Sequence, residues 1–333
     1  MQDSSSRRKK IVRSVIFLAG LLGLLLWMSH QITDFTKKNG DMIQGRNKSI
    51  VEIQKEPENT IDVLVVGDSE SYTSVSPLEM WKNQGVASFI CGQSGQKIQE
   101  TYYMLKTALT HQSPKLVLLE TNVLFRNMKG VKGIQEEVIQ KADYYFPIFR
   151  FHDIWKNMLL GRKYTEERYK GFTLRDMVQS YDGGQYMKET TEKDQITQDM
   201  ENYTDKILEL CREHNARVMF YSAPSPLNYS YRKHNAIQEL ADKKQLLYLD
   251  LNLHTEELSI DWKVDSMDKG DHLNLSGANK VTQYLGAYIQ KRYELPDHRR
   301  EAAYQSWQKD AASYVEKAQK RIMLIQDRGN SGK

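Results

Sequence analysis

The chain has 333 residues, of which 40% are hydrophobic and 27% are charged, a composition that suits one large domain with appendages. Its formal net charge is +4, and residues 1–13 account for all of that excess. The neutral remainder excludes the basic face that nucleic-acid binding requires, so we expect no nucleic-acid partner.

An apolar segment follows the basic amino-terminal tail. An uninterrupted apolar run extends from Val15 to Met28, and Ile11 and Val12 lengthen it towards the span that a bilayer requires. Arg13 can extend its side chain to the membrane interface. The pattern predicts a membrane segment over residues 11–28.

The competing interpretation of this segment is a cleavable signal peptide. The residues after the run are Trp27, Met28, Ser29 and His30, which offer no small-x-small cleavage site, so an uncleaved anchor is favoured. Positive charge at the amino end predicts a cytoplasmic N-terminus. We therefore expect a single-pass protein of the cell membrane with its folded part outside the cytoplasm.

Short apolar runs alternate with helix-period segments after a polar stretch at 31–58, which we interpret as a stalk. The apolar runs lie at residues 61–66, 86–90, 115–120, 216–221 and 246–250. Runs that are apolar on both faces are typical of strands buried between helix layers. The alternation predicts an α/β fold, an open parallel sheet covered by helices.

Residues 126–195 interrupt the alternation without a strand-like run. We interpret them as a helical and loop insertion that leaves the sheet at the carboxyl ends of strands, as a candidate lid or acceptor-binding wall. An amphipathic closing helix follows the last strand at 277–295, and a second, highly charged helix covers 298–326.

Four parts of the chain follow from these patterns. They are a cytoplasmic tail and anchor at 1–30, a stalk at 31–58, a domain at 59–295 and a charged helix with a tail at 296–333. Only two cysteines occur, Cys91 and Cys211, so buried free thiols are favoured over a bridge. No CxxC, HExxH or His-rich pattern supports a metal site.

The first strand runs directly into Gly67-Asp68-Ser69. These residue types also end strands in ordinary turns, so two interpretations stand: a turn, or Ser69 as a nucleophile. Acyl transfer by a serine requires a base, an acid that orients the base, and donors that face the oxyanion. Each should lie on a loop at the carboxyl end of a strand.

His272 is the candidate base, because it lies in a Gly- and Asp-rich loop just before the closing helix. Asp265, Asp268 and Asp271 lie within seven residues of it. Asp271 is adjacent and would have to bend back, whereas Asp268 can fold round through Lys269 and Gly270, so Asp268 is favoured as the orienting acid.

Candidate oxyanion donors follow the second and third strands. Gly92 and Gly95 would let a backbone N–H approach a bound oxygen, and Asn122 offers a side-chain amide. Taken singly, the glycines are better explained by a turn and Asn122 by a helix cap. Their placement at successive strand ends favours a common site.

The Ser69 turn after the first strand, the glycines after the second, Asn122 after the third and the His272 loop before the closing helix form four sequence blocks. Together, over residues 60–292, they resemble the four blocks of the SGNH/GDSL hydrolases. The resemblance implies a flavodoxin-like three-layer fold with a five-stranded parallel sheet. It also implies Ser69 as nucleophile, His272 as base, and the Ser69 backbone, a glycine (Gly92 or Gly95) and Asn122 as oxyanion donors. Two features depart from the family: Lys269 stands where the family usually has Asp, and the third block reads "ETNVLF".

With its anchor, the chain looks most like the membrane-tethered SGNH proteins that work beside membrane-bound O-acyltransferases, in alginate acetylation and D-alanyl lipoteichoic acid transfer. The resemblance implies an acyltransferase or esterase for a cell-surface polysaccharide or teichoic acid, with such a membrane enzyme as partner and no cofactor. A general carboxylesterase or lipase and a non-catalytic anchored glycan-binding or scaffold module remain as alternatives.

Overall fold

The structure, a computed structural model, describes residues 2–126, 130–164 and 169–331. Five parallel strands form one sheet in the order β2-β1-β3-β4-β5. The strands are β1 (Val63–Gly67), β2 (Ser88–Gly92), β3 (Leu116–Glu120), β4 (Arg217–Ser222) and β5 (Leu247–Asp250). This is the flavodoxin-like order, and the α/β prediction is confirmed.

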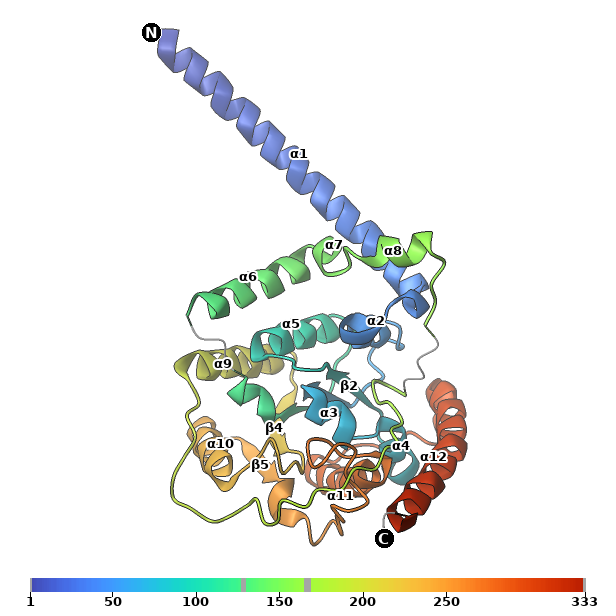
Figure 1. Cartoon of the computed structure of the whole chain (residues 1–333). Helices are drawn as coiled ribbons and strands as arrows, with labels where there is room; N and C mark the ends of the chain where they lie inside the picture. Colours follow the sequence, from blue (N-terminus) through green and yellow to red (C-terminus); the bar gives the residue numbers. More distant parts are fainter. Residues whose placement is uncertain (1, 127–129, 165–168, 332–333) are drawn as a thin grey trace.

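Helices cover both faces of the sheet (Figure 1). On one face lie α2 (Lys48–Ile53), α5 (Ile98–Leu109) and α9 (Gln198–Glu213), and on the other α4 (Pro77–Gln84) and α11 (Leu275–Tyr293). The short α3 (Ser69–Ser74) follows β1, and α10 (Tyr231–Lys244) packs on β5. All five residues of each of β1, β2 and β3 are buried, as expected for strands between two helix layers.

The remaining elements are mostly short. They are the 3-10 helices η1 (Gly40–Met42), η2 (Gly45–Asn47), η3 (Thr121–Phe125), η4 (Leu251–His254) and η5 (Ala302–Tyr304), and the helices α6 (Val131–Tyr145), α7 (Pro147–Arg150), α8 (Ile154–Leu159) and α12 (Gln305–Ser331).

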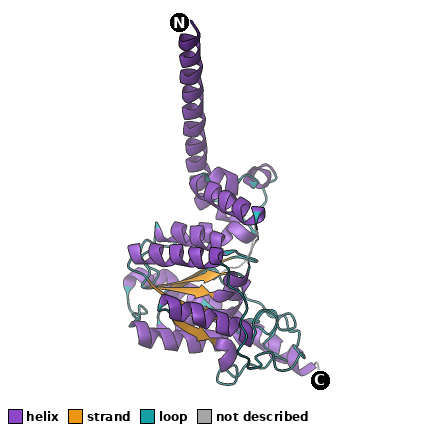
Figure 2. Ribbon diagram, turned by 90° about the vertical axis from the view of Figure 1, so that its left-hand side faces the viewer, coloured by secondary structure: helices purple, strands orange, loops and turns teal. Residues whose placement is uncertain are grey.

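The amino-terminal helix α1 (Gln2–Lys38) projects away from the domain (Figure 2). Its segment from Ser6 to Lys38 is long and apolar enough to cross a membrane by length and composition, and none of its most apolar window is buried. The same properties are found in signal sequences and in anchors.

The polar stretch at 31–58 differs from the stalk that the sequence analysis expects. Residues 31–38 continue α1 without a break, and Lys48–Ile53 form the buried helix α2, which packs on β2. Ile50, Val51 and Ile53 belong to the core. The composition of this stretch is polar, but its few apolar side chains face the sheet together.

The charged carboxyl-terminal segment also packs on the domain. Helix α12 lies against α4 and α11, and Trp307 and Tyr314 are buried there. Trp307 stacks at a tilt on Trp81 of α4, with 5.2 Å between ring centroids. The two cysteines are free and buried, as favoured, and burial raises the pKa of each thiol to about 12.

In the part that the structure describes, the insertion between β3 and β4 is helical in its first half and irregular in its second. Helices α6–α8 lie beside α5 and the base of α1 (Figure 1). The second half runs along the loop that carries His272: the Gln179 N–H donates to Ser266, and the Lys269 N–H donates to Gln179. Arg126 at the start of the insertion and this second half both lie near the candidate site residues.

Candidate active site

Ser69 is the first residue of α3, immediately after β1 ends at Gly67. Asp68 between them is the N-cap: its Oδ1 accepts the Glu70 N–H at 3.0 Å, and its carbonyl accepts the Ser71 N–H. This local bonding explains why the chain turns sharply here. It places Ser69 at the carboxyl edge of the sheet, beside the point between β1 and β3 where open sheets of this order bind ligands.

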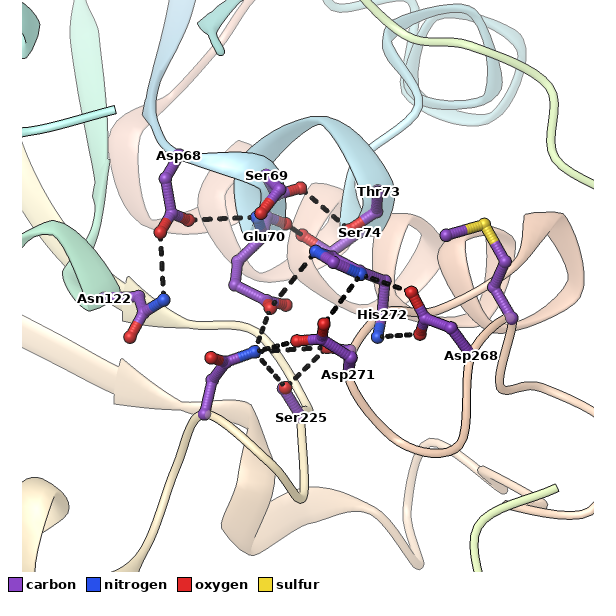
Figure 3. Close-up of polar contacts among 12 residues, drawn as sticks. Asp68, Ser69, Glu70, Thr73, Ser74, Asn122, Ser225, Asp268, Asp271 and His272 are labelled. Carbon is purple, nitrogen blue, oxygen red and sulfur yellow. Dashed lines mark hydrogen bonds and ion pairs between the residues drawn. The ribbon is translucent and has the colours of Figure 1, made fainter. Parts of the chain in front are cut away.

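Asp68 also ties the ends of β1 and β3 together. Its Oδ2 accepts the Asn122 side-chain amide at 2.9 Å and the Nε of Arg126. Asn122 therefore points at Asp68 (Figure 3), and its Oδ1 lies 3.4 Å from the Lys233 ammonium. The amide predicted as an oxyanion donor is thus already bonded to a carboxylate.

His272 is held by Asp268. The Asp268 carboxylate accepts the His272 backbone N–H at 2.6 Å with one oxygen and lies 2.7 Å from the ring Nδ1 with the other (Figure 3). Partial burial opposes ionisation of Asp268, but these two hydrogen bonds hold the pKa of its carboxyl below its usual range. The Asp268 carboxylate fixes the ring orientation and favours a proton on Nδ1.

Two left-handed residues allow Asp268 to reach the ring from four positions earlier. Lys269 and Gly270 have φ of +62° and +93°, and the Met267 N–H donates to the His272 carbonyl across the loop. The Ser266 hydroxyl accepts the Gly270 N–H at 2.7 Å. The loop therefore lets an acid four residues before the histidine reach its ring, and Lys269 does not interrupt the Asp–His contact.

The other two nearby acids have different partners. Asp271 Oδ2 is 3.6 Å from His272 Nδ1, while its Oδ1 accepts the Asn228 amide at 2.6 Å. Asp265 is completely buried and pairs with Lys280 at 2.6 Å. Of the three acids, Asp268 makes the close contact with the ring.

The opposite nitrogen of the His272 ring faces the first turn of α3 (Figure 3). Nε2 has no hydrogen-bond partner among the described residues, and Glu70 Oε1 lies 3.8 Å from it. Glu70 is 1% exposed, and its Oε1 accepts the Asn228 amide at 2.7 Å. Burial, and then the charge of Asp68, raise the pKa of Glu70 well above its usual range, so this acid favours the neutral form.

The two candidate glycines lie in different surroundings. A Cβ at Gly92 would lie 2.2 Å from Ser71 Oγ and 3.3 Å from the Asp68 carbonyl oxygen, so a glycine lets the end of β2 approach the serine turn. Gly95 has φ of +61° in the turn after β2, and a Cβ there would meet nothing within 4 Å. Gly92 is therefore the glycine next to the serine turn.

Several polar residues at the carboxyl edge of the sheet were not predicted from the sequence. Glu70 follows Ser69 directly, Glu120 ends β3, Arg126 follows η3, and Asn228 lies in the loop after β4. The polar loop after β4 is the signal that would have found Asn228, because it too leaves the carboxyl edge of the sheet. Glu70 had no such signal, since an acid in a turn is ordinarily exposed.

Glu70, Asp271 and His272 could together approach a cation, since their ligand atoms lie within 4.8 Å of one another. Both acids already share the amide of Asn228, which occupies one oxygen of each. The sequence analysis expects no metal here.

Glu120 is the second fully buried acid of this edge. It accepts a hydrogen bond from the Tyr229 hydroxyl and, at 3.0 Å, from the Asn122 N–H. Burial, and secondarily the charge of Asp68, raise the pKa of Glu120 to about 8. The folded protein therefore holds a proton here that the unfolded chain releases at lower pH.

Replacing Glu120 by Gln is expected to remove a pH dependence from stability. The wild-type free energy of unfolding should fall as pH rises from about 4.5, the unfolded value, to about 8, because only the folded state keeps the proton. Below that window the two proteins should differ by a constant. Urea unfolding between pH 4 and pH 9 measures this, with the exposed Glu256→Gln as control; curves that stay parallel for wild type and Glu120→Gln would contradict the expectation.

Comparisons with known proteins do not assign the chain to a family. No protein-family model and no curated protein matches the chain. A solved candidate acylhydrolase of Bacteroides fragilis shares 12% identity and a TM-score of 0.38, over 73% of this chain and 94% of that one. A GDSL-like lipase of Bacteroides thetaiotaomicron shares 13% identity and a TM-score of 0.34, over 70% and 87% of the two chains.

A third solved structure, a candidate GDSL-like lipase of Parabacteroides merdae, shares 12% identity and a TM-score of 0.36, over 72% of this chain and 98% of that one. Similarity at this level does not indicate what reaction this protein catalyses. Any activity has to be argued from the residues at the sheet edge.

Proposed function

We propose that this protein is a serine-dependent esterase or O-acyltransferase. The observation that carries the proposal is the His272 ring, which Asp268 holds at Nδ1 with its Nε2 turned towards the turn that begins with Ser69. These residues come from sequence positions about 200 apart and meet at the ligand-binding edge of the sheet. An ordinary turn at Ser69 would not require an oriented imidazole beside it.

The proposed reaction proceeds through an acyl-serine. Ser69 Oγ attacks the ester carbonyl while His272 Nε2 takes the hydroxyl proton, and the same proton then passes to the departing alkoxide. Asp268 stabilises the imidazolium through Nδ1. A hydroxyl of the acceptor, or water, then attacks the acyl-serine while His272 Nε2 takes its proton, and the proton returns to Ser69 Oγ as the serine is released. The proposed reaction therefore requires no cofactor.

His272 Nε2 makes no hydrogen bond to Ser69 or to any other described residue, although Glu70 Oε1 lies 3.8 Å from it. Catalytic hydrogen bonds of ligand-free enzymes are often long and close only with substrate. The oxyanion would meet the Ser69 N–H and the backbone of Gly92 or Gly95. A contribution from the Asn122 amide would use the hydrogen that is not directed at Asp68.

We further propose the SGNH/GDSL family and a surface-polymer acceptor. The block order and the flavodoxin-like sheet support the family, and the exposed apolar α1 supports an extracytoplasmic domain held at the cell membrane beside a membrane-bound O-acyltransferase. The acceptor would be a polysaccharide or teichoic acid. General carboxylesterase activity is the alternative within the same chemistry.

Aromatic residues beside the histidine loop support a sugar-binding wall. Tyr181 and Tyr186 of the insertion pack edge-on against Trp262, with 6.1 and 5.9 Å between ring centroids, and all three are only partly buried. Arg175, also in the insertion, lies 5.3 Å from the Tyr72 ring of α3. Stacking faces with a cation nearby would suit an anionic glycan.

A non-catalytic anchored module is the second candidate. It is favoured by the unpartnered His272 Nε2 and by the Asn122 amide bound to Asp68. Turnover of an activated ester by the full-length protein separates the two candidates, since a binding module would release no product.

Two conservative variants test the proposed acid. Asp268→Asn should lower the turnover of an aryl acetate by roughly 10²- to 10⁴-fold, because an amide cannot stabilise the imidazolium. Asp271→Asn is the matched control: it lies 3.6 Å from the ring against 2.7 Å for Asp268, so less than a tenfold loss is expected. Equal losses in the two variants would show that Asp268 does not orient the base.

A further inference from the structure

Helices α6–α8 carry a face of large apolar side chains that the described part of the chain leaves uncovered. On α6 these residues recur at helical spacing, and on α7–α8 they crowd into a short stretch. The apolar face consists of Val131, Ile134, Val138, Ile139 and Tyr145 on α6 with Phe149, Trp155, Met158, Leu159 and Leu160 beyond it, each 43% to 80% exposed. Exposed apolar patches of this kind mark interaction surfaces.

The other side of α6 is bound to the domain, which fixes the direction of the apolar face. Glu136 pairs with Lys97 of the loop before α5 at 2.5 Å, Glu137 lies 3.6 Å from Lys206 of α9, and Gln140 is buried. These three polar residues thus lie on the side of α6 that meets the domain, while the large apolar ones lie on the outward side together with the exposed Lys132, Gln135 and Lys141.

The apolar face lies beside the part of α1 that follows the apolar run ending at Met28. Trp27, Ile32 and Phe35 of α1 line one groove with Ile148 and Met158 of α7–α8. Phe35 is seven residues past Met28, which at 1.5 Å per residue is about 10 Å along the helix. Because α1 is continuous to Lys38, a bilayer that holds residues 11–28 would have its surface at the level of α7–α8.

We propose that the α6–α8 face lies in the interfacial layer of the bilayer that α1 spans, as a second membrane contact that presses the domain onto the lipid surface. The inference rests on the membrane anchoring proposed above. Trp155 and Tyr145 are of the residue types that prefer the headgroup level. Arg162 is exposed at the edge of the face and would meet anionic headgroups. Lys156 and Lys163 are exposed beside it and pair with Asp153 and Asp41.

Depth-dependent quenching in vesicles tests the proposal with the full-length protein. Single Ile134→Cys and Leu159→Cys variants, labelled with an environment-sensitive fluorophore, are reconstituted in vesicles of phosphatidylcholine and phosphatidylglycerol with or without lipids that carry a quencher on the acyl chain. Leu21→Cys on α1 reports insertion of the anchor, and Glu239→Cys on α10, far from α1 in Figure 1, is the aqueous control. The native cysteines are buried.

We expect several-fold quenching at Ile134 and Leu159, as at Leu21, and none at Glu239. If the label at Leu21 is quenched while those at Ile134 and Leu159 are not, the membrane contact of α6–α8 is overturned and the anchor stands. If no label is quenched at any of the four sites, the membrane contact and the anchor are both overturned. Since the readout does not use turnover, neither result bears on the proposed acyl-transfer chemistry.

Discussion

The Ser69→Ala variant is expected to lose the turnover of an aryl acetate by roughly 10⁴-fold or more, because the missing oxygen is the atom that would form the acyl-enzyme bond. Ser69 begins α3 at the end of β1, a helical position that alanine also suits. Release of the phenol by the full-length protein in detergent measures the effect.

Ser74→Ala is the matched control for this variant. Ser74 lies in the same helix, and its hydroxyl donates to the Glu70 carbonyl oxygen at 2.5 Å, so its loss removes a local hydrogen bond and no reacting atom. The control should keep its turnover. If Ser69→Ala kept it as well, Ser69 would not be the nucleophile.

The His272→Ala variant is expected to lose roughly 10³-fold or more of the same turnover, because His272 is the base proposed to take the hydroxyl proton. Imidazole added to the assay should restore part of the rate, since the vacated space can admit a free base. Rescue of this kind distinguishes a base from a residue that only holds the loop.

His254→Ala serves as its control. His254 pairs with Glu257 at 2.9 Å on the surface, away from the serine turn, and should be neutral for turnover. A His272→Ala protein that folds, keeps wild-type turnover and ignores imidazole would remove the proposed base.

The strands follow from the sequence because buried parallel strands are apolar on both faces, which leaves recognisable apolar runs. Their flavodoxin-like order was implied only by the resemblance to a known family. The prediction of a stalk at residues 31–58 was wrong because the average composition of a segment hides a few apolar side chains within it. Ile50, Val51 and Ile53 are few among polar neighbours, but a short helix places them together against the sheet.

Some features of the candidate site could likewise be predicted from the sequence, and others could not. Asp268 could be favoured over Asp271 by chain geometry alone, and the left-handed Lys269 and Gly270 show how the loop makes that contact. The partner of Asn122 could not be inferred, because it depends on the end of β1 meeting the end of β3. Glu70 was missed for a related reason: its burial arises from the loop after β4, far away in the sequence.

The central claim is that Ser69 is a nucleophile activated by His272. Incubation of the full-length protein with a fluorophosphonate, followed by mass spectrometry of its peptides, tests the claim directly. The account predicts one adduct on Ser69, formed much more slowly in His272→Ala and absent in Ser69→Ala. A wild-type protein that stays unmodified at Ser69, or that is modified equally fast without His272, would contradict it.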